Sequence, residues 1–175
     1  MLKDIIFAGF GGQGVQFCSK VVANTAMRMG KEISWLPSYG PEMRGGTSNC
    51  SVCIDESAIA SPLITEPTYL LALNEPSFVK FIDNVKAGGT AVFDSSLVCA
   101  QTERKDIEVY GIPATKMAKE NRLDGLANMI ALGYLIKKTD ILPLDEIKGC
   151  VNKMSKGKKE LEEKNYKALD IGYNY

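Results

Sequence analysis

The amino-acid sequence predicts a three-layer α/β/α domain built on a largely parallel, mixed sheet. Short apolar runs typical of buried strands alternate with longer segments in which apolar residues recur at helical spacing. A glycine-rich loop joins the first strand to the first helix, which is typical of a Rossmann-like βα unit. The 175 residues, 45% hydrophobic and 24% charged, have the size and balance of one soluble globular domain. We therefore expect residues 1–175 to form a single domain.

The first strand and the first helix are the elements that the sequence predicts most directly. The run KDIIFAGF (3–10) is short, apolar and bounded by glycine, as buried strands of parallel sheets are. In the next segment, 15–29, apolar residues return every three or four positions, and Gly30 suits the position just past a helix end. We expect a strand, a glycine loop and a helix in that order.

The middle of the chain is expected to continue with strands. Small and β-branched residues predict strands over 32–36 and 47–54. We expect Asp55 and Glu56 to turn the chain back into a further extended segment, SAIASP (57–62).

The remaining elements alternate between strand and helix. Asn74 is suited to cap a helix that carries Pro76 in its first turn. The expected elements are a strand over 68–74, a helix over 75–86, strands over 90–94 and 107–113, a largely buried helix over 124–138, and amphipathic helices within about 143–174. Asp94 closes the strand 90–94, where α/β proteins often bind ligands, although a capping or turn role is the simpler expectation.

The composition narrows the classes of function. Lys plus Arg equals Asp plus Glu at 21 each, so the net charge gives no attraction to nucleic acid or to an anionic membrane. No apolar run approaches the roughly 20 residues of a membrane span, and the N-terminus does not resemble a signal peptide. Five scattered cysteines fit a reducing compartment, so we expect a cytoplasmic protein. Histidine is absent, which removes the commonest general base near neutral pH.

The first glycine-rich loop, GFGGQG, carries the candidate ligand-binding residues. Gly9, Gly11 and Gly14 match G-x-G-x-x-G between a predicted strand and a predicted helix, which is the context that phosphate binding requires. Dinucleotide binding also needs an acid at the end of the second strand, whereas Glu32 stands at that strand's start. Three interpretations stay open: a dinucleotide site, a purely structural turn, and another kind of phosphate or anion site. The candidate residues are Gly9, Gly11, Gly12, Gln13 and Gly14.

The pair Cys50 and Cys53 forms a C-x-x-C, which invites a metal or redox interpretation. Both cysteines fall inside a predicted strand, where residues three apart point to opposite faces. Two thiolates on opposite faces cannot share one ion or form a disulfide. We expect two buried residues and no metal site.

A second glycine-rich stretch, PSYGPEMRGGTSNC, follows the second predicted strand. Its prolines and glycines frame an acid, a base and a methionine, which suits a shaped loop that packs against a partner or a ligand. Glu42 and Arg44 would share a face of an extended chain, and either a functional pair or a simple salt bridge fits. The candidate interface or ligand-edge residues are Tyr39, Glu42, Met43, Arg44, Gly45 and Gly46.

GFGGQG, PSYGPEMRGGTSNCSV and IASP together resemble the gamma subunit of 2-oxoacid:ferredoxin oxidoreductases, and NMIALG (128–133) resembles a later helix of that family. The resemblance covers about residues 1–141 and includes the pyruvate, 2-oxoglutarate, ketoisovalerate and indolepyruvate types. It implies a role in the oxidative decarboxylation of a 2-oxoacid to an acyl-CoA, with electrons passed to ferredoxin.

The same resemblance implies a noncatalytic subunit that contacts coenzyme A beside the reaction centre. Thiamine diphosphate and iron–sulfur clusters would lie in partner alpha, beta and delta subunits, and this chain alone would bind no cofactor and be inactive. Two alternatives stay open. One is a subunit that serves assembly without any ligand, and the other is a stand-alone dinucleotide-dependent oxidoreductase.

Overall fold

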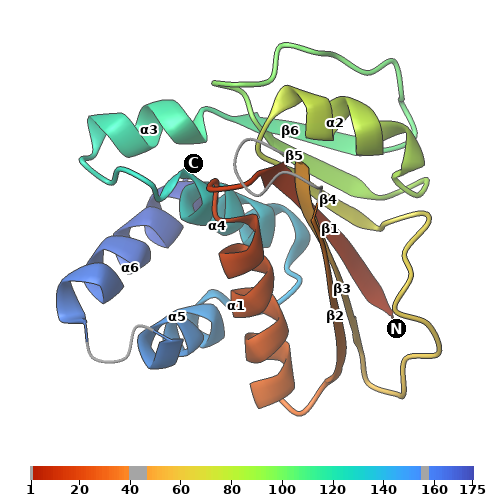
Figure 1. Cartoon of the computed structure of the whole chain (residues 1–175), viewed down its shortest axis with the longest axis horizontal. Helices are drawn as coiled ribbons and strands as arrows, with labels where there is room; N and C mark the ends of the chain where they lie inside the picture. Colours follow the sequence, from red (N-terminus) through yellow and green to blue (C-terminus); the bar gives the residue numbers. More distant parts are fainter. Residues whose placement is uncertain (1, 40–46, 155–157) are drawn as a thin grey trace.

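The protein forms one six-stranded sheet. The structure, a computed structural model, describes residues 2–39, 47–154 and 158–175. The strand order is β2-β3-β1-β4-β5-β6 (Figure 1). The strands are β1 (Lys3–Phe10), β2 (Glu32–Tyr39), β3 (Thr47–Asp55), β4 (Tyr69–Ala72), β5 (Thr90–Asp94) and β6 (Glu108–Ile112).

The sheet is mixed, as predicted, and its two halves differ in strand direction. On one side of β1, the strands β4, β5 and β6 continue the sheet in parallel. On the other side, β3 runs antiparallel to both β1 and β2. The β2–β3 pair folds back so that β3 lies between β1 and β2, with Phe7 opposite Cys50 and Trp35 opposite Val52. The first βα unit, β1 followed by the glycine loop and a helix, is therefore Rossmann-like. The strand after that helix, β2, departs from the Rossmann pattern because it pairs with β3 and not with β1.

Helices cover both faces of the sheet, which confirms the predicted three layers (Figure 1). On one face lie α1 (Val15–Arg28) and α4 (Ala127–Thr139), and on the other lies α2 (Glu75–Phe81), followed by the short 3-10 helix η1 (Ile82–Asn84). The remaining helices are α3 (Ala114–Glu120), α5 (Leu144–Met154) and α6 (Lys159–Tyr173).

Each face of the sheet has its own apolar core. The larger core joins β1 residues Ile5 and Phe7 to α1, α4 and the C-terminal helices. The smaller core joins Ile6 and Ala8 to Phe78 of α2. Consecutive β1 residues thus pack into opposite cores, which explains why the sequence of this strand is continuously apolar.

Most predicted elements are confirmed, one expected strand is absent, and one helix was not predicted. The Asn74 side chain accepts a hydrogen bond from the Ser77 N–H at 2.9 Å and caps α2 as expected. The segment 57–62 forms no strand, because β1 and β2 already lie on the two sides of β3, against which the chain would have had to turn back. The helix α3 was not predicted, since it spans only seven residues after Pro113 and its N-terminal N–H groups are satisfied from β5 and the turn after it, not locally.

The helix α4 is buried along most of its length, as its sequence predicts. It crosses α6 at two glycines. A Cβ on Gly133 would stand 2.2 Å from the Leu169 carbonyl oxygen, and one on Gly172 would stand 1.8 Å from that of Ile130. Only glycine allows the two backbones to come this close.

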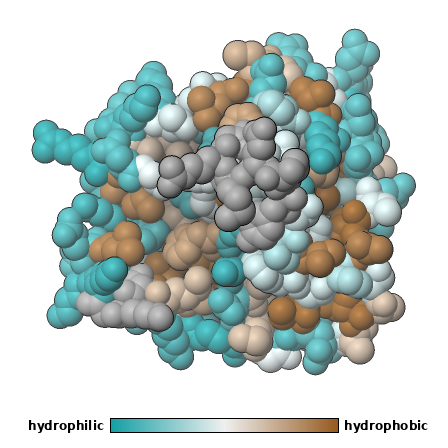
Figure 2. Space-filling model, in the orientation of Figure 1, coloured by the Kyte–Doolittle hydropathy of each residue, from teal (hydrophilic) through white to brown (hydrophobic). Residues whose placement is uncertain are grey.

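The surface carries hydrophobic residues in several separate groups on the face seen in Figure 2. Over the described chain as a whole, the exposed large hydrophobic side chains include Leu63, Val79 and Leu36. Within the described ranges, no helix combines the length and apolar character that crossing a bilayer would demand.

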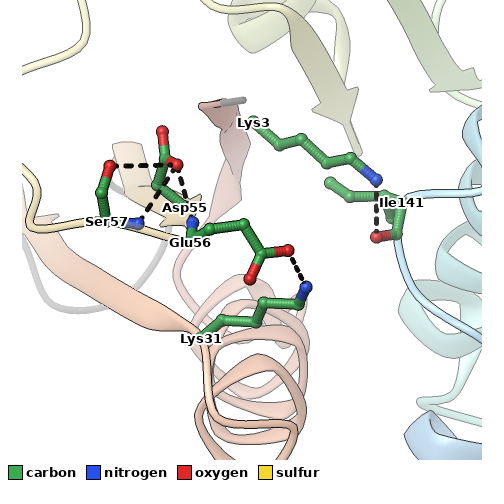
Figure 3. A network of polar contacts seen from close by, with 6 residues as sticks. All are labelled: Lys3, Lys31, Asp55, Glu56, Ser57 and Ile141. Carbon is green, nitrogen blue, oxygen red and sulfur yellow. Dashed lines mark hydrogen bonds and ion pairs between the residues drawn. The ribbon is translucent and has the colours of Figure 1, made fainter.

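Polar contacts tie together the end of the sheet where β1 begins (Figure 3). The Lys3 ammonium donates to the Ile141 carbonyl oxygen at 3.1 Å, just after α4. Lys31 pairs with Glu56 and so links the entry of β2 to the exit of β3. The Asp55 carboxylate accepts the Glu56 N–H at 2.6 Å, which lowers the pKa of Asp55. These contacts stabilise the end of the sheet that lies opposite the glycine loop.

Candidate functional site

The glycine loop between β1 and α1 takes a conformation that depends on two of its glycines. Gly12 has φ +97° and Gly14 has φ +78°, in the left-handed region that residues with a Cβ seldom enter. Gly14 is the N-cap of α1, and its carbonyl accepts the Cys18 N–H. No described residue lies within 4 Å of the position that a Cβ on Gly12 would take, so within the described chain the loop is open at this point.

The side chain of Gln13 holds the loop to the neighbouring strand. Its oxygen accepts the Phe10 N–H at 2.7 Å and the Asn74 side-chain amide at 3.0 Å. Its amide nitrogen donates to the Leu73 carbonyl at 2.9 Å. A Cβ on Gly9 would stand 2.8 Å from the Gln13 oxygen, so Gly9 makes room for this brace. Gln13 and Gly9 therefore shape the loop.

Asn128, on the buried helix α4, meets the loop from the other side. Its amide nitrogen donates to the Gly14 carbonyl at 3.2 Å, across 114 residues of chain. A Cβ on Gly14 would stand 2.2 Å from that nitrogen, so only glycine fits here. The Asn128 Oδ1 is buried and has no hydrogen-bond partner in the described part of the chain. Burying an amide oxygen without a hydrogen-bond donor costs free energy, so the described residues leave the hydrogen bonding of this atom incomplete.

A cavity of about 230 Å³ opens beside the loop, at the carboxyl ends of β4 and β5. Ligands of open α/β sheets bind at this end, near the point where the strand order reverses. The buried side of the cavity is formed by Asp94 and Asn128 together with Leu73 and Ala118, and the exposed side by Gly12, Lys119, Asp124 and Gly125. The cavity is also lined by Gln13, Thr115 and Ala127.

Asp94 has the capping role that its position favours. One carboxylate oxygen accepts the Ser96 N–H at 3.0 Å. The other accepts the N–H and the hydroxyl of Thr115, at 3.1 and 2.5 Å, and so holds the start of α3 against the end of β5. Asp94 is 1% exposed. This buried carboxylate therefore stabilises the wall of the cavity.

The loop has the features of an anion site. The backbone N–H groups of Gly12 and Gly14 form no hydrogen bond with any described residue. The 14-residue helix α1 begins here, and its first turn contains no acidic side chain. Free N–H groups and the positive end of a helix together favour a phosphate or a carboxylate.

The cysteines show no arrangement suited to catalysis or metal binding. Burial raises the pKa of Cys18 to about 12, so this thiol stays protonated near neutral pH. Cys50 and Cys53 lie on opposite faces of β3, as predicted, and burial raises the pKa of both. Among the residues that the structure describes, no cluster of three or more His, Cys, Asp or Glu residues could hold a metal ion.

The structure places some predicted site residues together and leaves others undescribed. Gly9 lies near the end of β1, Gly11, Gly12, Gln13 and Gly14 follow in the loop, and Gly12 and Gln13 line the cavity. Tyr39 is the last residue of β2, and Glu42, Met43, Arg44, Gly45 and Gly46 lie outside the described residues. Glu32 begins β2 opposite Asp55, at the far end of the sheet, as its position predicts.

The cavity residues that come from α3 and the turn after it were not predicted. Thr115, Lys119 and Asp124 follow no motif, and nothing local links them to the glycine loop. Asn128 gave one signal, since it is a polar residue in a helix that is otherwise largely apolar.

The fold and the site together define a class of protein. It is an α/β domain with a glycine loop at a helix N-terminus and a cavity at the strand ends. The family model described as "Pyruvate ferredoxin/flavodoxin oxidoreductase" matches residues 4–175. The chain belongs to this family.

Relatives of the chain include separate gamma-type subunits and parts of longer proteins. The 2-oxoglutarate synthase subunit KorC of Methanocaldococcus jannaschii is 34% identical over 177 residues, which cover 99% of this chain and 93% of KorC. The ketoisovalerate oxidoreductase subunit VorA of Methanothermobacter marburgensis is 35% identical over 170 residues, which cover 96% of this chain but 35% of VorA. The chain thus spans about a third of the VorA length.

Solved structures agree with this assignment. The gamma subunit of a keto/oxoacid ferredoxin oxidoreductase from Geobacter sulfurreducens superposes with a TM-score of 0.83, at 28% identity, over 98% of this chain and 96% of that one. The 2-oxoglutarate:ferredoxin oxidoreductase of Magnetococcus marinus, solved with 2-oxoglutarate, coenzyme A and succinyl-CoA bound, gives a TM-score of 0.88 at 24% identity, over 99% of this chain and 30% of that one, and shows the same fold.

Proposed function

We propose that this chain is a noncatalytic gamma subunit of a thiamine-diphosphate-dependent 2-oxoacid:ferredoxin oxidoreductase, which it helps to assemble and to supply with coenzyme A. The reaction would decarboxylate a 2-oxoacid oxidatively to an acyl-CoA and reduce ferredoxin. KorC, a relative of nearly the same length, carries the name of a 2-oxoglutarate synthase subunit, and this supports 2-oxoglutarate as the substrate of the complex.

The observation that carries the coenzyme A role is the open glycine loop at the start of α1. No described residue fills the space over Gly12, and the N–H groups there have no partner in the described chain. Coenzyme A is rich in phosphate, which a helix N-terminus binds well. The M. marinus enzyme of the same fold was solved with coenzyme A, and this agrees with the proposal.

Among the described residues, the side chains near the loop give no reason to assign catalysis to this chain. Cys18 is held as a thiol, and Asp94 is used by Thr115 and Ser96. The chemistry is therefore assigned to partner alpha, beta and delta subunits, which would hold the thiamine diphosphate and the iron–sulfur clusters.

Assembly is assigned to the β2–β3 half of the sheet. β2 is an edge strand, so one side of its backbone is available for pairing. Leu36 on this strand is 39% exposed. The loop that follows carries the residue types that are enriched in interfaces.

A pair of substitutions at Gly12 tests the phosphate role. Asn and Asp enter positive φ more readily than other residues with a Cβ, and the two are nearly equal in size. In a complex reassembled from all subunits, we expect Gly12→Asp to raise the KM for coenzyme A at least tenfold in ferredoxin reduction, because its carboxylate would stand beside the bound phosphate. A tenfold change corresponds to about 1.4 kcal/mol.

Gly12→Asn is the control, since it adds the same bulk without the charge. It should raise the KM much less, and the gap between the two variants should shrink at high salt. Equal KM values for wild type, Gly12→Asp and Gly12→Asn would contradict a phosphate site at this loop and would favour a subunit that serves assembly alone.

The stand-alone dinucleotide enzyme receives less support. Its ribose would need an acid beside the loop, and Glu32 stands at the opposite end of the sheet. Titration of the isolated chain with NADH, followed by fluorescence, tests this alternative directly. We expect no binding.

A further inference from the structure

The connection between β3 and β4 is much longer than its path requires. These two strands lie on either side of β1, so the chain has to pass only two strand spacings, roughly 10 Å. The 13 residues that make the connection, 56–68, could span about 40 Å if they were extended. Connections of more than about 12 residues without a helix or strand of their own are uncommon in compact domains and are often functional. The excess length points to a role beyond joining two strands.

The middle of this connection, residues 57–65, is exposed and carries no charge. We call this segment the arm. Its sequence, SAIASPLIT, lies between Glu56 and Glu66. Seven of its nine residues are exposed, and Leu63, at 71%, is the most exposed of the large hydrophobic side chains in the described chain. Apolar residues gathered in one exposed segment indicate an interaction site, whereas single scattered ones do not.

The backbone of the arm is left largely without partners. Within the described ranges, its N–H and C=O groups take part in no backbone–backbone hydrogen bond. The N–H groups of Ser57 and Leu63 donate only to nearby side chains, those of Asp55 and Ser61, at 3.4 and 3.2 Å. An exposed segment with free backbone groups can pair with the backbone of a partner, except at Pro62, which has no N–H.

Contacts at both ends hold the arm on the domain. At its start, the Asp55 carboxylate accepts the Glu56 N–H at 2.6 Å (Figure 3). Beyond its end, the Asp4 carboxylate accepts the Thr68 N–H at 2.7 Å. Within the arm, the half-buried Ile64 packs against the smaller core. A segment that is already held in place loses less conformational entropy when it binds a partner.

The arm begins where β3 ends, so it continues the half of the sheet to which we assign assembly. Figure 1 shows it in yellow, on the side of the molecule away from α5 and α6. A specific interface takes about 20–30 residues from each partner, and the arm alone supplies fewer than half of them. We therefore expect the arm to act together with a larger surface, such as that of β2 and β3.

Two features favour a larger subunit, and not a second copy of this chain, as the occupant of the arm. Two copies that met through their arms alone would contribute too few residues for a stable dimer. The cavities at the glycine loop, at the start of β1 and along α6 are also poor acceptors, because each is lined by at least three charged side chains. Covering charged groups with an uncharged segment costs free energy. An uncharged groove elsewhere suits the arm better.

We propose that the arm is a docking element whose Leu63 side chain inserts into an uncharged, apolar groove on a larger subunit of the oxidoreductase. This inference rests on the proposed function, because it requires a complex in which this chain is the gamma subunit. Backbone groups at the rim of the groove would pair with the free N–H and C=O groups of the arm.

Substitutions at Leu63 test the insertion. Biolayer interferometry measures the affinity of the chain for the remaining subunits of the complex. Leu63→Asp should weaken binding at least tenfold, because it places a charge in an apolar groove. Leu63→Met keeps an apolar side chain of similar size and should stay within about threefold of wild type.

Leu161→Asp is the control for a charge placed on another part of the surface. Leu161 lies on α6 and is 42% exposed, so this variant should also bind within about threefold of wild type. Thermal unfolding of the isolated chains accompanies the measurement. Because the Leu63 side chain is largely exposed, Leu63→Asp should unfold at the wild-type temperature, which separates weaker binding from a loss of folding.

Hydrogen exchange of the wild-type chain gives a second test that needs no substitution. The amides of the arm have no backbone partner in the described chain, so they should exchange rapidly when the chain is alone. In the assembled complex we expect their exchange to slow at least tenfold. Equal rates in the isolated chain and in the complex would overturn the inference.

Binding of Leu63→Asp as tightly as wild type would also overturn it. A dimer of the isolated chain that Leu63→Asp disrupts, with binding to the other subunits unchanged, would make a second copy the occupant and would equally contradict the proposal. A wild-type chain that binds none of the other subunits would contradict the proposed function together with the inference. If the wild-type chain binds them and the Gly12 pair leaves the KM unchanged, the coenzyme A role alone fails.

Discussion

The two halves of the sheet differ in how far their strands are buried and in which helices cover them. The parallel half, β4 to β6 beside β1, has helices on both faces, and the strands β4 and β5 are buried at nearly every position. In the antiparallel half, α1 covers one face of β2 and β3, and the first part of β3 alternates between buried and less buried residues. The difference shows that β4 and β5 of the parallel half form the buried centre of the domain, whereas the antiparallel half offers more surface.

The candidate site lies where the two halves meet. The glycine loop leaves β1, the strand that both halves share. Gln13 ties this region to the parallel half through Leu73 and Asn74, and Gln16 ties it to the antiparallel half through Ser48 and Asn49. The loop is therefore held by hydrogen bonds from both halves, and a ligand bound there would be linked to the buried centre and to the surface that we assign to partner subunits.

The largest expected effect comes from one truncation made in each half. Leu71 of β4 is 1% exposed, and Leu71→Ala should lower the free energy of unfolding by about 2–5 kcal/mol, because it removes buried methyl groups and leaves a cavity. Leu36→Ala on β2, where the side chain is 39% exposed, should change it by no more than about 1 kcal/mol. Urea denaturation of both variants measures the difference.

The same pair bears on assembly. If β2 meets a partner, Leu36→Ala should reduce recovery of the other subunits in co-purification although the chain itself stays folded. Equal losses of stability for the two variants would show that the halves are buried alike and would remove the contrast between them.

An alkaline titration should locate a pH-sensitive group under the antiparallel half. Burial raises the pKa of Cys18 on α1 to about 12, from 9.0. The unfolded chain then releases its proton at lower pH than the folded chain, so this contribution to stability is complete below pH 9 and is lost as the pH rises towards 12. At 1.36 kcal/mol per unit, the loss reaches about 2–3 kcal/mol at pH 11.

The measurement compares unfolding of wild type and Cys18→Ala between pH 8 and 11. Cys18→Ala lowers stability throughout through lost packing, but its stability should fall less steeply above pH 9. Cys99→Ala removes an exposed thiol and should keep the wild-type slope. If Cys18→Ala and wild type had the same slope, the buried thiol would not be the titrating group.

A smaller effect should distinguish the two glutamines that hold the loop. Gln13→Ala removes three hydrogen bonds and should cost about 1–2 kcal/mol, because the Phe10 N–H and the Leu73 carbonyl lose a partner in a partly buried place. Gln16→Ala removes two bonds and an oxygen that is already unpaired, so it should cost about 0.5–1 kcal/mol. Thermal unfolding measures both, and a larger loss for Gln16→Ala would mean that the antiparallel half is the firmer anchor.

Much of the fold could be predicted because its signals are local. The apolar run 3–10, the helical spacing of 15–29 and the Asn74 cap each depend on residues close in sequence. The antiparallel insertion of β3 could not be predicted, since strand direction is set by which edges remain open in the folded sheet. The helix α3 was missed because Asp94, 21 residues away, supplies its N-terminal partner.

The site divides in the same way. The motif predicted the glycine loop, and the structure adds that Gln13 and Gly9 shape it while Gly12 leaves it open. The cavity residues on α3 and in the turn after it carried no motif, whereas Asn128 on α4 stood in the segment NMIALG of the family resemblance. Met43 and Arg44 stay predictions, since they lie outside the described residues.

By itself, the sequence determined the βα unit with its glycine loop and the likeness to gamma subunits. Both depend on short motifs whose residues are close together in the sequence. Only the tertiary structure decided what faces the loop. Asn128 lies 114 residues from Gly14, and their contact exists because α4 packs beside α1 on one face of the sheet. Long-range packing, which no local pattern encodes, holds the glycine loop from α4 and forms the cavity beside it.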